Sequence, residues 1–364
     1  MTMTRACHNK KAYFRWVYAI LALIFVSMPL VVMSGSVTIP LSETVNIFLS
    51  HFPFVGSDEA IRSGANTIIW ELRLPRTLLA CIAGAGFALA GTTLQVATRN
   101  TLAEPHLLGV SSGAVLGAVI ATLHAGELLP AFLLSELSLS GFSLPAFSLP
   151  AFAFAGALLA TCCIALMNRY LPSSSPLTLL MSGVAISFIF ASLANLLLFL
   201  GDHRASHQVI FWMLGGFGLA RWENIFLPFS VCCIAYVYLM YQSSKMNALL
   251  LGDETAHSLG IAIERLRLQL FVCSAMVTAV LVASCGAIGF IGLVMPHIAR
   301  SIVGGSTQRV LTLSALLGAL FLPWADLLAR LILSPEELPI GILTGLLGGF
   351  FFLFILAKKS RSIF

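Results

Sequence analysis

Long apolar segments, separated by short polar stretches, fill most of the chain. A helix needs about 20 apolar residues to cross the hydrocarbon core of a bilayer. The pattern therefore predicts about ten transmembrane helices, of which the eighth is the weakest. The expected spans are Trp16–Met33, Thr77–Gln95, Leu107–Leu123, Ala151–Met167, Leu177–Leu200, Ile225–Tyr241, Leu266–Cys285, Ile288–Val303, Leu311–Leu328 and Ile340–Ala357.

The composition is typical of a membrane protein. Of the 364 residues, 59% are hydrophobic and 10% are charged, whereas roughly a quarter of the residues of a soluble domain carry charge. We expect an all-α polytopic membrane protein with one transmembrane domain over residues 16–358 and short cytoplasmic tails at 1–15 and 359–364. The first apolar segment resembles a cleaved signal, but it is longer than the apolar core of about 7–15 residues in signals. We therefore expect a retained span.

The basic residues indicate the orientation. If the N-terminus is cytoplasmic, fourteen Lys and Arg residues fall on the cytoplasmic side of the ten spans and six fall outside. An excess of Lys and Arg marks the cytoplasmic loops of membrane proteins. The pattern therefore predicts that both ends of the chain are cytoplasmic.

The sequence lacks the residues that several kinds of functional site require. The net charge of +5 is spread along the chain, so nothing indicates nucleic-acid binding. The sequence has no Gly-Lys pair, which a phosphate-binding loop requires. Seven of the eight cysteines lie in apolar segments and are expected to be small core residues. We expect no catalytic site, no bound cofactor and no metal in this chain.

Ionisable residues are almost absent from the ten spans. Ion-coupled carriers keep such residues at membrane depth as coupling sites. A self-contained secondary carrier is the alternative function of another class, and this absence counts against it. An intramembrane enzyme would need paired catalytic groups. The nearest pair, Glu104 and His106, falls in a cytoplasmic turn where we expect both side chains to be solvated.

A proline-rich repeat marks the outer stretch 129–152. The tetrapeptide Leu-Pro-Ala-Phe begins there at Leu129, Leu144 and Leu149. Proline at this density argues against a continuous helix. We expect a loop that lies partly in lipid, with a pair of half-spans as the alternative.

Glycines line one face of the third span, and a second set precedes a proline in the eighth. Small faces let helices approach closely in lipid, and a glycine-rich run permits a broken helix. Simple packing and a sliding or hinge role are both open for each set. The packing or hinge candidates are Gly109, Gly113, Gly117, Gly286, Gly289, Gly292 and Pro296.

Three arginines lie on the expected outer side. Arg73 and Arg76 are three residues apart at the start of the second span, and Arg330 ends the ninth. A guanidinium group binds a carboxylate through two parallel hydrogen bonds, so these residues are candidates for recognising an acidic partner. Binding of lipid phosphates is the alternative.

A polar cytoplasmic loop over about residues 242–265 belongs to no span. Asp253 is expected to cap a short helix over residues 254–259, and Gly260 is expected to end it in the left-handed conformation. This helix is a candidate contact for a cytoplasmic partner, with an ordinary surface helix as the alternative.

Four runs of the sequence resemble the FecCD-type permeases, the membrane subunits of ABC importers for iron siderophores, haem and vitamin B12. The similarity extends in order from about residue 16 to 358. Thr101, where the family usually has proline, and the stretch 129–152 depart from it. The runs are Arg73–Arg76, Arg99–Pro105 with Leu108–Gly113, Gly286–His297 and Glu337–Gly341.

This resemblance implies the type II ABC importer permease fold in the bacterial inner membrane, with a second permease subunit in a homodimer or close heterodimer. It implies two ATPase subunits that bind ATP and magnesium, and a periplasmic or lipid-anchored substrate-binding protein. By position it assigns binding-protein docking to Arg73, Arg76 and Arg330, ATPase coupling to Glu254, Ala256 and Gly260, and a cytoplasmic gate to Ser173, Ser174, Ser175 and Thr178.

The function implied is the import of an iron chelate, a ferric siderophore or haem, with vitamin B12 as the alternative cargo. Hydrolysis of ATP by the separate subunits would rock two permease subunits so that an apolar path opens first to one side and then to the other. A path with few charges suits large chelates that the binding protein has already selected.

Overall fold

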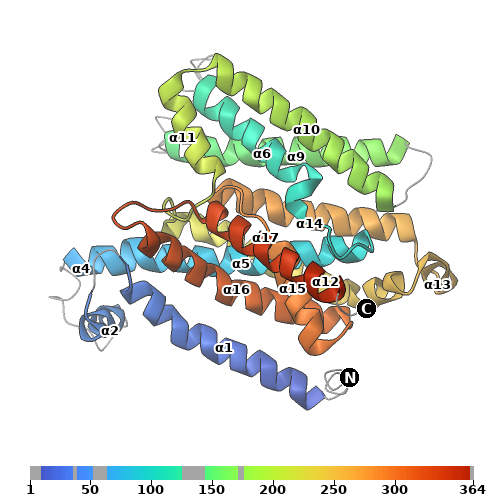
Figure 1. Ribbon diagram of the computed structural model, residues 1–364, viewed down its shortest axis with the longest axis horizontal. Coiled ribbons are helices and arrows are strands. Elements are labelled where there is room, and N and C mark those ends of the chain that lie inside the picture. The colour runs from blue at the N-terminus through green and yellow to red at the C-terminus, as the bar shows by residue number, and fades with distance from the viewer. Residues whose placement is uncertain (1–9, 36–38, 52–63, 125–143, 171–175, 361–364) are drawn as a thin grey trace.

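The computed structural model of the protein describes residues 10–35, 39–51, 64–124, 144–170 and 176–360, and it is helical with no strand over that part of the chain (Figure 1). The helices are α1 (Lys10–Met33), α2 (Leu41–Ser50), α4 (Gly64–Asn66), the π-helical η2 (Thr67–Arg73), α5 (Leu74–Ala97), the 3-10 helix η3 (Pro105–Leu108), α6 (Val110–Val119), the π-helical η4 (Ile120–His124), α9 (Leu144–Tyr170), α10 (Pro176–Leu200), α11 (His203–Met213), α12 (Trp222–Leu250), α13 (Asp253–Ser258), α14 (Ile263–Cys285), α15 (Ile291–Val303), α16 (Thr307–Ile332) and α17 (Ile340–Ser360).

Seven of these helices are long and apolar enough to cross a membrane. Three shorter apolar helices, Val110–Leu123, Ile291–Val303 and Ile340–Ile355, fall on the third, eighth and tenth predicted spans. The expectation of an all-α polytopic membrane protein is confirmed. The number of ten crossings stays a prediction, because α15 has only 13 residues and a helix rises about 1.5 Å per residue.

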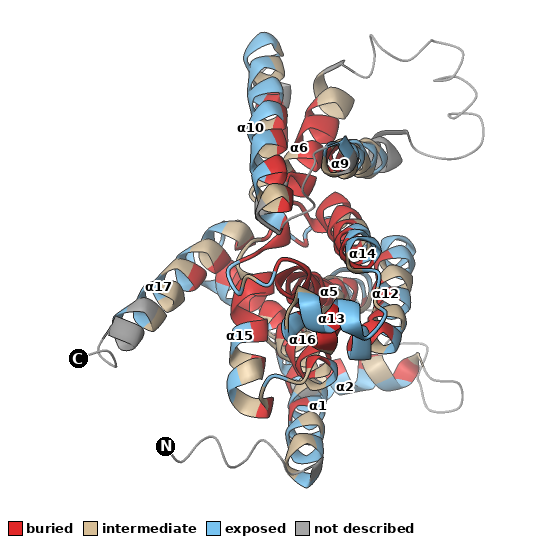
Figure 2. Ribbon diagram, turned by 90° about the vertical axis from the view of Figure 1, so that its right-hand side faces the viewer, coloured by how far each residue is buried: buried red, intermediate tan, exposed pale blue. Residues whose placement is uncertain are grey.

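The helices form two groups around α5 and α6. α5 is surrounded by α16, α14, α12 and α15, whereas α6 packs against α9 and α10. α14 contacts α9 and α6 as well as α5, and it thereby joins the two groups. Figure 2 shows buried residues concentrated on α5 and on the faces turned toward it.

Glycines explain how closely these helices approach. A β-carbon on Gly84 of α5 would lie 2.0 Å from the carbonyl oxygen of Gly318 in α16, and one on Gly91 would lie 2.0 Å from the carbonyl oxygen of Gly292. The backbones are thus in direct contact, as glycine allows in membrane helices. Without a side chain at these positions, α5 can take a central place among its four neighbours.

The two ends of the bundle carry different elements. Figure 1 shows the start of α1, the end of α17 and the short helix α13 at one end, and α2 and α4 at the other. This arrangement agrees with the prediction that both ends of the chain lie on the same side as the polar loop over about residues 242–265. The assignment of that side to the cytoplasm stays a prediction.

Two sequence expectations about helix boundaries are wrong. The helix of the second span begins at Gly64, not at Thr77, and is continuous through η2. α9 begins at Leu144 and includes Pro150, so two of the three Leu-Pro-Ala-Phe copies are helical. The apolar run continues the helix there, because Pro145 lies in the first turn, where its missing N–H would have no partner, and Pro150 removes one backbone hydrogen bond. The copy at Leu129 lies outside the described residues.

Two helices, α2 and α11, were not expected from hydropathy because each is short. α2 packs Ile47 into a small apolar cluster beside Trp70. His51 stacks on Trp70 with 3.7 Å between ring centroids, and the Trp222 indole donates a hydrogen bond of 2.9 Å to the Trp70 carbonyl oxygen.

The cysteines differ in their burial. Cys232 and Cys285 are buried, whereas Cys162 and Cys233 are exposed, so the expectation of core cysteines fails for the latter two.

Candidate functional sites at the two ends of the bundle

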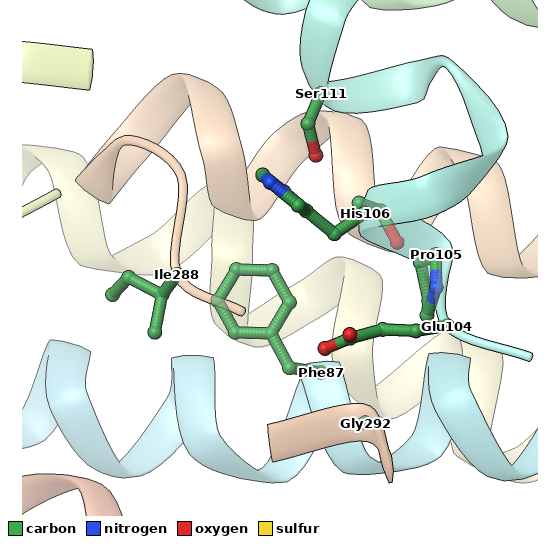
Figure 3. Close-up of a pocket in the computed structure, with 8 residues that line it drawn as sticks. Phe87, Glu104, Pro105, His106, Ser111, Ile288 and Gly292 are labelled. Carbon is green, nitrogen blue, oxygen red and sulfur yellow. The ribbon is translucent and has the colours of Figure 1, made fainter. Parts of the chain in front are cut away.

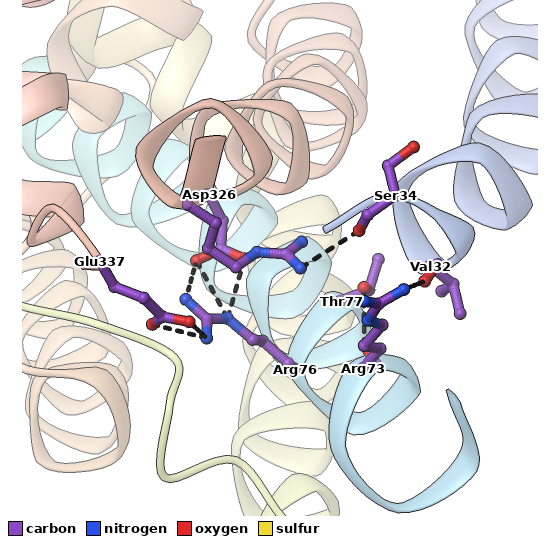
Figure 4. A network of polar contacts seen from close by, with 8 residues as sticks. Val32, Ser34, Arg73, Arg76, Thr77, Asp326 and Glu337 are labelled. Carbon is purple, nitrogen blue, oxygen red and sulfur yellow. Dashed lines mark hydrogen bonds and ion pairs between the residues drawn. The ribbon is translucent and has the colours of Figure 1, made fainter. Parts of the chain in front are cut away.

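A network of charged side chains lies at the end of the bundle opposite α13. Arg76 of α5 donates from Nε and Nη2 to the Asp326 carboxylate of α16 at 2.9–3.2 Å, and from Nη1 to the two Glu337 oxygens at 3.0 and 2.9 Å (Figure 4). Arg330 Nε lies 3.1 Å from Asp326 Oδ2, one helical turn along α16. Asp326 therefore holds two arginines at once.

Arg73 and Arg330 bind the end of α1. Arg73 Nη1 donates to the carbonyl oxygens of Val32 and Met33 at 3.2 and 2.9 Å, and Arg330 Nη1 donates to that of Ser34 at 3.4 Å (Figure 4). The last carbonyls of a helix lack partners within the helix and carry partial negative charge. The two cations therefore satisfy the end of α1 and attach it to α5 and α16.

Burial separates the three arginines. The side chains of Arg73 and Arg330 are 7% exposed and that of Arg76 is 14% exposed. The sequence suggested three guanidinium groups open to an acidic partner, but the structure engages Arg73 and Arg330 inside the protein. Sequence reasoning missed Asp326 and Glu337 as the partners of Arg76. Among the described residues of this network, Glu337 lies at the surface: its side chain is 54% exposed where it binds Arg76.

The short helix α13 protrudes at the opposite end (Figure 1). Ala256 is buried against the chain, Glu254 and Gly260 are exposed, and Gly260 has φ +74°. The left-handed end at Gly260 matches the sequence expectation. A non-glycine residue there would cost about 1–2 kcal/mol, so glycine suits the sharp exit from α13.

Asp253 does not cap α13 as expected. Gly252 holds the cap position, and the Asp253 carboxylate instead accepts hydrogen bonds from Arg267 of α14 at 2.8 and 3.0 Å and from Arg99 at 3.1 Å. The charge of two arginines outcompetes a neutral backbone N–H for the carboxylate. Asp253 thereby attaches α13 to α14 and to the linker that follows α5.

A cleft of about 600 Å³ lies beside α13. Its lining includes Lys245, Leu259, Gly260 and Arg265. All four residues are exposed, and two are basic. The cleft borders the polar loop over about residues 242–265, the candidate contact for a cytoplasmic partner.

The glycine-rich run between α14 and α15 forms a break in a helix. Gly286 has φ +72°, and a β-carbon there would lie 2.2 Å from the Trp212 carbonyl oxygen. Phe290 also has a positive φ, +69°, which is uncommon for a bulky residue. A β-carbon on Gly348 of α17 would lie 2.3 Å from the Phe290 ring. The aromatic ring therefore occupies the gap that this glycine leaves.

Glu104 stabilises this break from the α5–α6 linker. Its carboxylate accepts a hydrogen bond from the Phe290 N–H at the start of α15, and Glu104 is 6% exposed. Glu104 lines a cavity of about 10 Å³ with Phe87, Ser111 and Gly292 (Figure 3), a space for about one water molecule. The expectation of a solvated Glu104–His106 pair is wrong for Glu104, because the linker folds back into the bundle.

Burial raises the pKa of the Glu104 carboxyl to about 7, whereas the hydrogen bond from the Phe290 N–H acts in the opposite direction. Near neutral pH the carboxyl therefore changes its charge. The sequence contains a feature that could have drawn attention to Glu104: it is the one acidic residue of the segment Arg99–Pro105.

The remaining candidates lie at close helix contacts. Gly113 meets Gly156 of α9 and Gly117 meets the Phe152 carbonyl oxygen. Gly109 is left-handed before α6, with φ +80°. Gly289 lies beside the Glu104 carboxylate, and Gly292 packs on Gly91. Pro296 is buried within α15.

The proposed gate is only partly described. Thr178 is half-buried in the first turn of α10, and its carbonyl oxygen accepts a hydrogen bond from the Ser182 hydroxyl at 2.7 Å. Ser173, Ser174 and Ser175 lie outside the described residues. Over the described ranges, no three His, Cys, Asp or Glu side chains gather in a way that could hold a metal ion.

Known proteins resemble the chain over nearly its whole length. The model of the FecCD transport family matches residues 20–358. The hemin transport system permease protein of Yersinia pestis is 35% identical over 81% of this chain and 84% of its own. The vitamin B12 import system permease protein of Citrobacter koseri is 33% identical over 99% of each chain.

A solved structure has the same fold. It is described as a metal-chelate type ABC transporter in an inward-facing conformation, with 28% identity, a TM-score of 0.76, and coverage of 95% of this chain and 99% of its own. This similarity confirms the importer permease fold expected from the sequence.

Proposed function

The chain belongs to the FecCD transport family, and from this membership we propose that it is the permease subunit of a binding-protein-dependent importer for an iron chelate. As a member of that family it is a multi-pass ABC importer permease. The finer assignment comprises the cargo, a ferric siderophore or haem, and the bacterial inner membrane as its location.

The placement of two polar sites at opposite ends of one bundle supports this proposal most directly. The Arg76 network lies at one end, and α13 with its cleft lies at the other. A binding protein that delivers cargo and an ATPase that drives transport must contact opposite faces of the membrane. The chain thus has a candidate contact for each.

For the energy-coupling face, we assign contact with a separate ATPase subunit to Glu254 and Gly260 on the exposed part of α13. Ala256 would fix the helix against the permease, since it is fully buried. The ATPase subunits would bind ATP and magnesium, and this chain would bind neither.

For transport we infer alternating access in a pair of permease subunits, with a homodimer as the simplest form. Close glycine contacts hold α5 rigidly against α15 and α16, so these helices would move as a body. The break between α14 and α15 is a place where such movement could be absorbed. Thr178 and the serines before α10 would form the gate at the cytoplasmic end.

Two relatives support the choice of cargo class. The Yersinia pestis relative is named for hemin, and the solved structure is described as a metal-chelate type transporter. The Citrobacter koseri relative, named for vitamin B12, makes cobalamin the second candidate. An ion-coupled carrier is disfavoured, since the chain belongs to a family of ABC permeases.

Growth of a deletion strain tests the proposal. The strain, with and without a plasmid copy of the gene, would be iron-starved and given one iron source at a time: several siderophores or haem. A parallel medium would require cobalamin uptake. We expect loss of growth on one iron source and its return with the plasmid.

A defect confined to the cobalamin medium would replace the iron chelate by vitamin B12. Normal growth of the deletion strain on all of the sources tested would refute both cargoes. Purification of the tagged permease from the complemented strain should also yield an ATPase subunit and a substrate-binding protein. Vesicle transport driven by an ion gradient, without any ATPase subunit, would instead support the carrier.

A further inference from the structure

We propose that Glu337 occupies the position on Arg76 that a carboxylate of the binding protein takes during docking. Glu337 would thus be an internal competitor that the partner displaces. This inference rests on the proposed function, because it assumes that an acidic partner docks at this end of the bundle.

Arg76 divides its donors between two different carboxylates. Nε and Nη2 bind Asp326, which is 2% exposed, whereas Nη1 binds both oxygens of Glu337, which is 54% exposed (Figure 4). The inner carboxylate is additionally held by Arg330 at 3.1 Å. The guanidinium therefore has one fixed side and one side that faces the surface.

The outer pair can exchange without disturbing the inner one. Glu337 lies in the segment between α16 and α17, outside any helix. Exposed ion pairs contribute little to stability, whereas a buried carboxylate shared by two arginines is costly to release. If Glu337 turns away, Asp326 still orients Arg76 and partly balances its charge. The freed Nη1 then faces an incoming partner.

The geometry also indicates the chemical class of the partner group. Nη1 offers two N–H donors, and Glu337 shows that both oxygens of one carboxylate fit there, at 3.0 and 2.9 Å. An Asp or Glu side chain on an acidic protein surface would reproduce this arrangement. A free small anion would have to compete with a carboxylate attached to the same chain, whose effective concentration is high. A protein that makes further contacts can win this competition.

Displacement has a consequence for affinity. Each docking event breaks the Arg76–Glu337 pair before it forms the new one, so the internal pair weakens binding and favours release of the partner. Removing the Glu337 charge should therefore tighten docking. We expect a decrease in Kd of about 1.5- to fivefold, the range that the free energy of an exposed ion pair allows.

The experiment compares Glu337→Gln with Glu336→Gln in the full transporter in lipid nanodiscs. Both residues are exposed glutamates in the same segment, so both variants change the surface charge equally. Among the described ion pairs, Arg76 binds Glu337 and not Glu336. The probe is the substrate-binding protein that copurifies with the permease, and the measurement is its Kd. A third variant, Arg76→Gln, tests the docking site itself.

We expect tighter binding with Glu337→Gln, an unchanged Kd with Glu336→Gln, and weaker binding with Arg76→Gln. An unchanged or weaker affinity of Glu337→Gln would overturn the competitor, as would equal tightening by both glutamate variants, which would indicate general surface charge. If Arg76→Gln still weakens binding in those cases, the docking assignment stands without the competitor. If no variant alters Kd, docking at this network is wrong and the competitor fails with it.

Discussion

Replacement of Asp326 should lower the free energy of unfolding, because this carboxylate binds two arginines inside the protein. The substitution Asp326→Asn preserves the shape of the side chain and removes its charge. The carboxylate is 2% exposed, while Arg76 and Arg330 are 14% and 7% exposed. Neither cation can turn freely into solvent when its partner loses its charge.

The size of the effect depends on what the asparagine side chain can still bind. Removing one partner of a buried pair costs about 3–5 kcal/mol. Asparagine retains one oxygen that can accept a hydrogen bond from Arg76, and Glu337 continues to bind Nη1. We therefore expect the lower end of this range, a loss of about 3 kcal/mol in the free energy of unfolding.

A second variant separates charge from packing. In Asp326→Asn combined with Arg330→Met, the unpaired cation is removed as well, and Arg76 keeps Glu337. Removal of both charges leaves no uncompensated charge between these two positions, so the double variant should recover at least half of the loss. Glu337→Gln is the matched control, since its pair is exposed and should contribute less than about 1 kcal/mol.

The assay is reversible unfolding of the purified protein in mixed micelles, followed by circular dichroism. The reasoning is refuted if Asp326→Asn lies within about 0.5 kcal/mol of the wild type, the size of an ordinary surface substitution. It is also refuted if the double variant is no more stable than the single one.

Three further predictions concern other parts of the bundle. Gly84→Ala should lower the free energy of unfolding by about 1–3 kcal/mol in the same assay, because its methyl group meets the Gly318 carbonyl oxygen at 2.0 Å. The control Gly345→Ala, with nothing within 4 Å of the added methyl group, should not lower it. Equal effects of the two variants would contradict the packing argument. Glu104→Gln keeps an acceptor for the Phe290 N–H and removes a carboxyl whose pKa is raised to about 7. The wild type should therefore lose stability relative to this variant as pH rises from 5 to 8, and a difference in stability that does not change with pH would refute the assignment. Glu104→Ala, which has no acceptor, should be less stable than Glu104→Gln. The double variant with Glu254→Ala and Gly260→Val should leave ATP hydrolysis by the complex intact while transport into proteoliposomes falls. The control Ser258→Ala, on the same helix, should transport normally. Normal transport by the double variant would exclude the coupling role.

Hydropathy predicted the long helices well, because a bilayer requires continuous apolar segments whatever the rest of the chain does. It missed α2 and α11, which are too short to cross, and it placed the start of the second span at Thr77 although the helix begins at Gly64. Residues 64–73 include Glu71 and Arg73, whose charges lower the hydropathy there.

The charged residues of these networks could be picked out from the sequence, but their partners could not. Arg76 was recognisable by its position, yet its partners Asp326 and Glu337 lie 250 and 261 residues further along the chain. No local pattern reports such pairs. Asp253 shows the same limit at shorter range: as a cap it would have served its own helix, but the fold brings Arg99 and Arg267 close enough to take the carboxylate.

The linker from Arg99 to Glu104 has a mechanical consequence. At one end Arg99 is bound to Asp253 of α13, and at the other Glu104 accepts a hydrogen bond from the Phe290 N–H at the start of α15. The stretch of six residues is thus attached to α13 at one end and to the start of α15 at the other. The linker therefore connects α13 to the break between α14 and α15 by a route that does not run along α14.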